Sequence, residues 1–281
     1  MAKTIKKGET METLFYILIF IIGALFGSFY TLAIYRIPKK QDITHTHSYC
    51  PNCNHKLGLL DLIPIFSYIF LLGKCRYCKE KIRPRYLIIE ILSGILFVAI
   101  AYLNNFNFET LSILSIMEYA FIILYLTFII LMVGIDRENR KIEKSVTIYG
   151  IVISIMYMIY LCIVEEANIY RYVIYLIAYI IILIFDTITL KRYAKSTYLN
   201  SILLCIITMT IFTSEYIVFN TIITTLIAIA IYLIIEKVKN RMSKSKKSDK
   251  QLARNISIGF YLGVINILLL LIILTYVKFI I

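Results

Sequence analysis

The sequence predicts an all-α polytopic membrane protein of about eight transmembrane helices, with a small cysteine-containing cytoplasmic domain between helices 1 and 2. Three observations support this fold class. The chain of 281 residues is 60% hydrophobic, with a mean hydropathy of +0.82, which is too apolar for an ordinary soluble domain. The apolar residues gather in runs of membrane-spanning length, and the charged residues gather between those runs.

The first apolar run extends from Leu14 to Ile34 and is long enough to cross a bilayer. A basic start followed by an apolar run is also typical of a secretory signal, but further spans follow and no Ala-x-Ala cleavage site is present. The other expected spans are residues 86–103, 115–135, 145–164, 172–190, 198–213, 217–235 and 257–277. The span at 198–213 is short, so it could be tilted or partly interfacial.

Basic residues are distributed unevenly between the segments that join the spans. Of the 30 Lys and Arg, 25 lie in residues 36–85, 136–144, 191–195 and 236–254. Such loops remain in the cytoplasm, so these segments are predicted to be cytoplasmic and both termini to lie outside. The basic residues of these cytoplasmic segments account for the net charge of +13. The 236–254 segment is therefore interpreted as a solvated loop attracted to membrane lipid, and no nucleic-acid partner is expected.

Two Cys-x-x-Cys pairs lie in the first basic segment. Cys50 and Cys53 form one pair, Cys75 and Cys78 form the other, and 21 residues separate the pairs. Two such turns supply the four thiolates of a structural zinc site. Two disulfides or free thiols are the alternatives, and a reducing cytoplasm disfavours disulfides. The other two cysteines lie alone in apolar spans and are expected to be packing residues.

Two aspartates lie where an apolar span is predicted to meet the cytoplasm. Asp136 closes the third span, and Asp186 lies inside the fifth. A carboxylate in an apolar helix is costly unless it is paired, protonated or used, so both are candidate catalytic residues. A helix-end charge facing headgroups is the alternative for Asp136. If the two helices pack together, the carboxylates could share a proton and hold a water, as in aspartic proteases.

Several short motifs follow one another between Ser48 and Glu90. They are Cys50-Pro51-Asn52-Cys53, Asp61-Leu62-Ile63-Pro64, Ser67-Tyr68, Gly73-Lys74-Cys75-Arg76-Tyr77-Cys78, Arg85-Tyr86 and Glu90. Together they resemble the cytoplasmic loop of the type IV prepilin peptidases. The end of the first run, from Gly27 to Pro38, resembles the first helix of that family, with Thr31 in place of an asparagine.

The resemblance continues around the first aspartate. Prepilin peptidases hold two essential aspartates at the cytoplasmic ends of helices. Ile135, Asp136 and Ile142 match the family pattern around the first of them, and Glu143 stands where proline is usual.

The resemblance is weaker around the second aspartate, whose family motif is G-x-G-D-x-K. The residues at 183–188 include Asp186 but lack both glycines and the lysine. The final span resembles its family counterpart at Gly259, Tyr261 and Leu262, while both prolines of that motif are replaced.

The resemblance implies a membrane aspartic endopeptidase with Asp136 and Asp186 as its catalytic pair. Members of the family remove the short basic leader from type IV prepilins or pseudopilins at the cytoplasmic face of the bacterial inner membrane. Many also methylate the new N-terminus with S-adenosylmethionine.

Three domains are expected on this basis. They are an N-terminal segment with the first helix (1–35), a four-cysteine zinc domain (36–85) and a seven-helix peptidase domain (86–281). The missing glycines favour an alternative function, a catalytically degenerate membrane scaffold or assembly subunit derived from the same fold.

Overall fold

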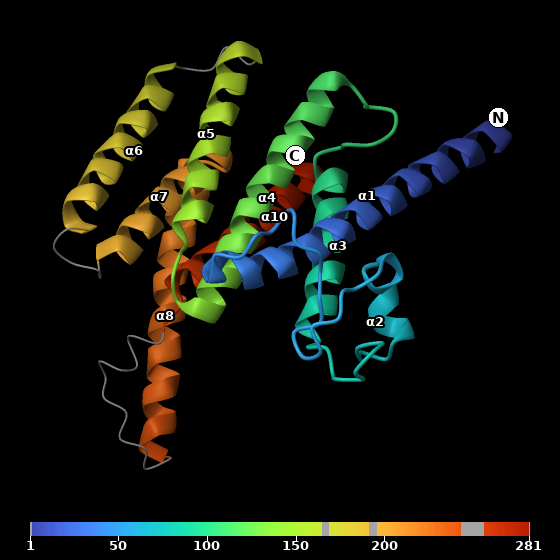
Figure 1. The fold of residues 1–281 in the computed structure, drawn as a ribbon. Helices are drawn as coiled ribbons and strands as arrows, with labels where there is room; N and C mark the ends of the chain where they lie inside the picture. Colours follow the sequence, from blue (N-terminus) through green and yellow to red (C-terminus); the bar gives the residue numbers. More distant parts are fainter. Residues whose placement is uncertain (1, 165–168, 191–195, 243–255, 281) are drawn as a thin grey trace. The chain divides into compact units, whose positions relative to one another are not determined.

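The computed structural model describes residues 2–164, 169–190, 196–242 and 256–280. Within these residues the secondary structure is helical apart from two isolated β-bridges (Figure 1). Seven of the described helices are long and apolar enough to cross a membrane. The shorter apolar helix Tyr198–Phe212 lies in the span that was expected to be short. The predicted all-α membrane architecture is confirmed.

Most helices begin and end close to the predicted spans, but α1 begins at Ala2, well before the expected Leu14, and α8 extends beyond its expected end. They are α1 (Ala2–Arg36), α3 (Arg85–Leu103), α4 (Ile113–Asn139), α5 (Lys144–Val164), α6 (Ile169–Leu190), α7 (Ser196–Phe212), α8 (Glu215–Met242) and α10 (Ile258–Ile280). The cysteine-containing segment holds the short helix α2 (Phe66–Phe70). Because α8 continues to Met242, the first part of the segment expected to be a loop at 236–254 is helical. The predicted loops at 191–195 and 243–254 lie outside the described residues.

The chain packs as two compact units. The first is Met1–Ile123 with Leu274–Ile281, and the second is Leu124–Ile273. The first unit contains the four-cysteine segment, and the second contains both candidate aspartates. The division into three domains expected from the sequence stays a prediction.

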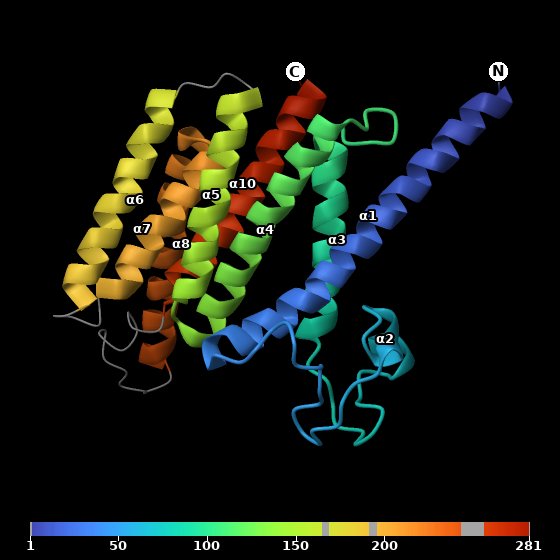
Figure 2. The same cartoon turned by 45° about the horizontal axis from the view of Figure 1, so that its top comes forward.

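Close packing of α1 on α3 organises the first unit, in which the two helices cross (Figure 2). Gly23 and Gly27 lie four residues apart on α1. A Cβ at Gly27 would lie 2.7 Å from the Cα of Glu90, and one at Gly23 would lie 2.8 Å from the carbonyl oxygen of Ser93. Small residues at this spacing allow the backbones of membrane helices to approach closely.

Buried polar side chains join the helices of the second unit. The Tyr179 hydroxyl of α6 lies 3.2 Å from the Ser154 hydroxyl of α5 and 2.9 Å from the Thr208 hydroxyl of α7. The Tyr125 hydroxyl of α4 donates to the Asn266 side chain of α10 at 2.6 Å. Apolar surfaces give little net attraction between helices in lipid, so hydrogen bonds and close packing fix which helices associate.

We expect Gly27→Val to separate α1 from α3, because its side chain would overlap backbone atoms that cannot move aside. The free energy of unfolding should fall by about 2 kcal/mol or more. Thermal unfolding of the detergent-solubilised protein should then show a midpoint lower by at least ~4 °C. Leu25→Val is the matched control, because Leu25 is 52% exposed on the same helix. Equal midpoints for the two variants would contradict the close packing.

Candidate metal centre and buried carboxylates

Both Cys-x-x-Cys pairs lie in the same kind of backbone turn. In the first turn, Cys50 N donates to the His55 carbonyl at 3.0 Å, and Asn54 N donates to the Cys50 carbonyl at 2.8 Å. The second turn, Cys75–Glu80, repeats both bonds at the equivalent positions. The residue four positions after the first cysteine has a positive φ in both turns, 56° and 59°. The two turns therefore present their cysteines in the same way.

The four predicted ligands come together at one point. The sulfur atoms of Cys50, Cys53, Cys75 and Cys78 all lie within 4.8 Å of one another. Cys50 Sγ and Cys78 Sγ are 3.8 Å apart. Four sulfurs arranged tetrahedrally at ~2.3 Å from one ion would be about 3.8 Å apart. The donor set therefore fits a single tetrahedral metal ion.

The hydrogen bonds around the thiols favour a bound cation. The backbone N–H of Glu80, followed by the side chain of Asn52, lowers the pKa of the Cys78 thiol to about 7. A backbone hydrogen bond from His55 acts in the same direction on Cys53, but burial and the neighbouring thiols raise the pKa of Cys53 to about 11. Four thiolates this close together need a positive charge between them.

Asp61 joins the apolar segment to the second cysteine turn. Its carboxylate accepts hydrogen bonds from Arg76 Nε at 2.6 Å, from Tyr77 OH at 3.2 Å and from Gly58 N at 3.1 Å. Burial alone would raise the pKa of Asp61, but these hydrogen bonds hold it below its usual value. The charge-assisted contact with Arg76 thus connects two of the sequence motifs.

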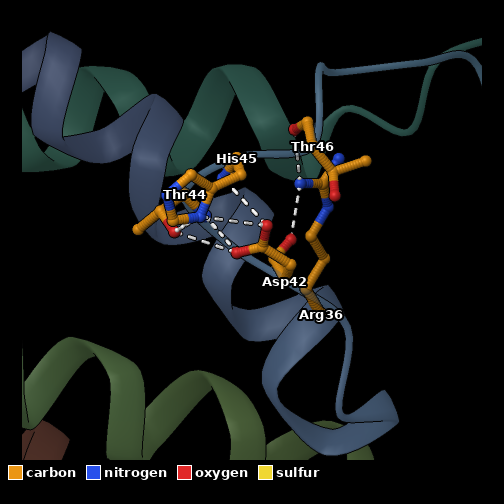
Figure 3. Close-up of polar contacts among 5 residues, drawn as sticks. All are labelled: Arg36, Asp42, Thr44, His45 and Thr46. Carbon is orange, nitrogen blue, oxygen red and sulfur yellow. Dashed lines mark hydrogen bonds and ion pairs between the residues drawn. The ribbon is translucent and has the colours of Figure 1, made fainter.

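Arg36, the last residue of α1, fixes the turn that follows it (Figure 3). Its guanidinium is buried and donates to three backbone carbonyls, among them those of Asp42 and Thr46, each at 2.9 Å. The Asp42 carboxylate closes the turn by accepting the backbone N–H groups of Thr44 and His45. The hydrogen bonds from Thr44 lower the pKa of Asp42 to about 2. The path from α1 to the first cysteine is therefore held by polar contacts.

A cavity of about 520 Å³ lies in the first unit, between α1, the cysteine turns, α2 and α3. Glu90 is among its lining residues and is 8% exposed. The Glu90 carboxylate accepts the backbone N–H of Ile65 at 2.7 Å. Basic side chains such as Lys39 and Arg83 also line the cavity. Its volume lies in the range that holds small organic ligands.

Asp136 is completely buried near the end of α4 and accepts hydrogen bonds from two other helices. Tyr198 OH of α7 donates to Oδ1 at 2.9 Å, and Phe260 N of α10 donates to Oδ2 at 2.9 Å. The same Tyr198 oxygen accepts the N–H of Ile258 at 3.0 Å. Since α10 begins at Ile258, these oxygens satisfy free N–H groups at a helix N-terminus, which favours a negative charge.

Gly259 permits this approach of α10 to the carboxylate. A Cβ at this position would lie 3.1 Å from Asp136 Oδ2 and 3.3 Å from Ile142 Cδ1. Both Gly259 and Ile142 belong to the residues that carry the family resemblance. The structure thus brings residues from two distant motifs to one carboxylate.

Asp186 lies on α6 with 18% of its side chain exposed. Asn200 Nδ2 of α7 donates to Asp186 Oδ1 at 3.0 Å. Lys144 Nζ, at the start of α5, lies 3.9 Å from Oδ2. Lys144 therefore supplies a cation beside Asp186, although the lysine of the family motif is missing from α6.

The two aspartates contact α7 on different sides. Successive residues of an α-helix are ~100° apart around its axis, so Tyr198 and Asn200 point in different directions. In both views α5 and α7 lie between α4 and α6 (Figures 1 and 2). The structure therefore places each aspartate against a polar residue of α7. The sequence analysis did not identify Tyr198 or Asn200, whose signal is a pair of polar side chains at the start of an otherwise apolar span.

Comparison with known protein families identifies a match in the first part of the chain. Residues 21–104 match the family model described as the Bacterial Peptidase A24 N-terminal domain. This match includes all four cysteines and ends before both aspartates. No solved structure matches the chain.

Curated proteins named prepilin leader peptidase/N-methyltransferase are similar to part of this chain. The Vibrio cholerae protein is 38% identical over 103 residues, which are 34% of this chain and 41% of that protein. The Myxococcus xanthus protein is 31% identical over 142 residues, covering 50% of this chain and 40% of that protein. The Bacillus subtilis protein is 40% identical over 82 residues, covering 29% and 33%.

These alignments span about half or less of the length of each of these relatives. Within that span the similarity agrees with the motifs found in the sequence. The predicted resemblance to the type IV prepilin peptidases is therefore confirmed, and it is carried by residues 21–104, which match the N-terminal domain model.

Proposed function

We propose that this chain is a membrane aspartic endopeptidase that removes the short basic leader from type IV prepilins or pseudopilins. Cleavage takes place at the cytoplasmic face of the bacterial inner membrane, with the four-cysteine loop in the cytoplasm and both termini outside. The observation that carries the proposal is the match of residues 21–104 to the A24 peptidase N-terminal domain. The names of the similar proteins supply the substrate class.

Asp136 and Asp186 are the proposed catalytic pair. One ionised carboxylate takes a proton from water, and the water oxygen attacks the scissile carbonyl carbon. The protonated carboxylic acid donates its proton to the carbonyl oxygen, as in other aspartic proteases. Collapse of the tetrahedral intermediate breaks the C–N bond. The departing amine takes the proton that the first carboxylate removed from water, and the second carboxylate regains its proton from a hydroxyl group of the intermediate. Asp136 is suited to this chemistry because it is withheld from water yet held by oriented donors.

A movement of α7 is proposed to bring the pair to one water. Each carboxylate is hydrogen-bonded to its own α7 residue, Tyr198 or Asn200. A shift of α7 that keeps Tyr198 on Asp136 and releases Asn200 from Asp186 would allow the two carboxylates to approach the same water and peptide bond. Binding of the hydrophobic substrate helix is the proposed trigger, because that helix reaches the site by diffusion within the membrane.

The metal held by the four cysteines is proposed to be a structural zinc ion. The four cysteine sulfurs would fill all four positions of a tetrahedral ion, which leaves none for substrate and is typical of structural sites. Cys50 and Cys53 would hold the ion from one turn and Cys75 and Cys78 from the other, and its positive charge would join the two turns.

N-methylation of the new N-terminus is the second proposed activity, since the similar proteins are also named N-methyltransferases. S-adenosylmethionine would supply the methyl group. The cavity of about 520 Å³ in the first unit is large enough for a ligand of that size. Its carboxylates, including Glu90, suit the positive charge of such a donor.

A non-catalytic membrane scaffold derived from the same fold is the alternative. The observation that favours it is the sequence at 183–188, which lacks the glycines and the lysine of the family motif. A scaffold has no need of either aspartate, so substitution of these residues separates the two functions.

We expect Asp136→Asn and Asp186→Asn each to abolish cleavage of a co-expressed prepilin, because an amide cannot act as the acid or the base. The measurement is the mobility shift of the prepilin on a gel, and the expected loss is about 1000-fold or more. Glu109→Gln is the matched control, since Glu109 is an exposed carboxylate in the segment between α3 and α4.

Loss in Asp136→Asn alone would exclude Asp186 from the catalytic pair. Unimpaired cleavage by Asp136→Asn would contradict the proposed mechanism, and an inactive wild type with several cognate prepilins would favour the scaffold.

Elemental analysis of the purified protein should find about one zinc per chain. Cys50→Ser/Cys75→Ser should lose the ion, because two of its four ligands are removed. Cys162→Ser should retain it, since Cys162 lies within α5. A zinc-free wild type whose four loop cysteines do not react with thiol reagents would instead indicate disulfides.

Tyr198 is proposed as a positioning residue, because it orients Asp136 without a required contact to substrate. Tyr198→Phe should lower kcat by about tenfold or more and leave KM nearly unchanged. Tyr232→Phe, a change of the same kind on α8, should alter neither constant. A higher KM with an unchanged kcat would contradict a positioning role.

A further inference from the structure

The apolar segment between the two cysteine pairs, residues 59–72, is exposed although it lies outside the membrane-spanning helices. Eight large apolar side chains are between 37% and 87% exposed. They are Leu59, Leu60, Leu62, Ile63, Phe66, Ile69, Phe70 and Leu72. An apolar surface of this extent on a loop marks an interaction site.

Helix α2 divides this segment into two faces. Phe66, Ile69 and Phe70 form the exposed face, in which the two phenyl rings stack with centroids 6.4 Å apart. Ser67 and Tyr68 lie on the other face and line the cavity described above. One side of α2 is therefore packed on protein, and the apolar side is turned away from it.

A hydrogen bond to α3 fixes the position of the segment along that helix. Ile65 N, directly before α2, donates to Glu90 Oε2 at 2.7 Å. Glu90 lies five residues after Arg85, the first residue of α3, and therefore about 7.5 Å along that helix. Helix α2 therefore lies beside the first turns of α3 and not beyond its end (Figures 1 and 2). Since α3 is long and apolar enough to span the membrane, α2 lies at the depth of the membrane boundary.

The residues that follow the segment are strongly basic. Lys74, Lys79, Lys81 and Arg83 are exposed within ten residues of one another. At the edge of a bilayer, such cations are attracted to anionic lipid headgroups. An apolar face at the depth of the membrane boundary, followed by exposed lysine and arginine, has the composition of an interfacial membrane anchor.

We propose that residues 59–72 insert into the interface of the membrane leaflet and that the neighbouring cations contact anionic phospholipid headgroups. The segment would hold the four-cysteine domain against the bilayer. This proposal goes beyond peptidase activity and does not depend on it.

The experiment uses the absence of tryptophan from the sequence. Phe70→Trp introduces a single tryptophan on the exposed face of α2, which is excited at a wavelength that the 23 tyrosines hardly absorb. The full chain is reconstituted in vesicles of phosphatidylcholine and phosphatidylglycerol, with or without bromine atoms near the headgroup end of the acyl chains. Brominated lipid should reduce the fluorescence at least about twofold, because bromine quenches only at contact. Aqueous iodide should have little effect.

Lys56→Trp is the matched control, since Lys56 is exposed in the first cysteine turn. Its fluorescence should respond to iodide and not to brominated lipid. Phe66→Trp repeats the measurement at a second position of the same face. Both α2 variants should retain the metal content of the wild type, which shows that the domain is folded.

Quenching of Phe70→Trp and Phe66→Trp by iodide alone would place the segment in water and overturn the proposal. Protection from both quenchers would indicate that protein, such as a second copy of the chain, covers this face, and would also overturn it. Equal quenching of Lys56→Trp by brominated lipid would mean that the whole domain lies on the bilayer without specific insertion of the segment.

Discussion

A carboxylate buried at the end of an apolar helix must find hydrogen-bond donors inside the protein. In the second unit, Asp136 finds them on α7 and α10. This requirement draws the first turn of α10 against α4, where Gly259 leaves room for the carboxylate that a Cβ, 3.1 Å from Oδ2, would reduce. The Tyr198 and Asp136 oxygens accept hydrogen bonds from the free N–H groups at the start of α10. The carboxylate thereby gains donors, and the helix end gains acceptors.

The four-cysteine segment is likewise held together by polar contacts. It contains one short α-helix, two 3-10 helices of three residues and two isolated β-bridges, which are too little for a hydrophobic core of its own. Polar contacts replace that core. Arg36 binds backbone carbonyls, Asp61 binds Arg76, and four thiols meet at a point that fits one ion. A bound metal would therefore contribute directly to the folding of this segment.

The sequence predicted the apolar helices well because each extends over many residues of uniform character. It also predicted the meeting of the four cysteines, since two rigid turns leave few other arrangements. The order in which helices pack was not predictable, because apolar faces in lipid are chemically alike. The contacts of Tyr198 with Asp136 and of Asn200 with Asp186 join positions 62 and 14 residues apart, and no local pattern encodes them.

Around Asp186, other helices of this chain compensate for the missing lysine of the family motif but not for its missing glycines. Lys144 and Asn200 supply a cation and a donor from other helices, so the carboxylate is held without the lysine of the family motif. The glycines of that motif have no such substitute. Leu183 and Phe185 occupy their positions with side chains that are 40% and 54% exposed. If Asp186 belongs to a catalytic pair as proposed, Leu183 and Phe185 leave less room beside its carboxylate than two glycines would.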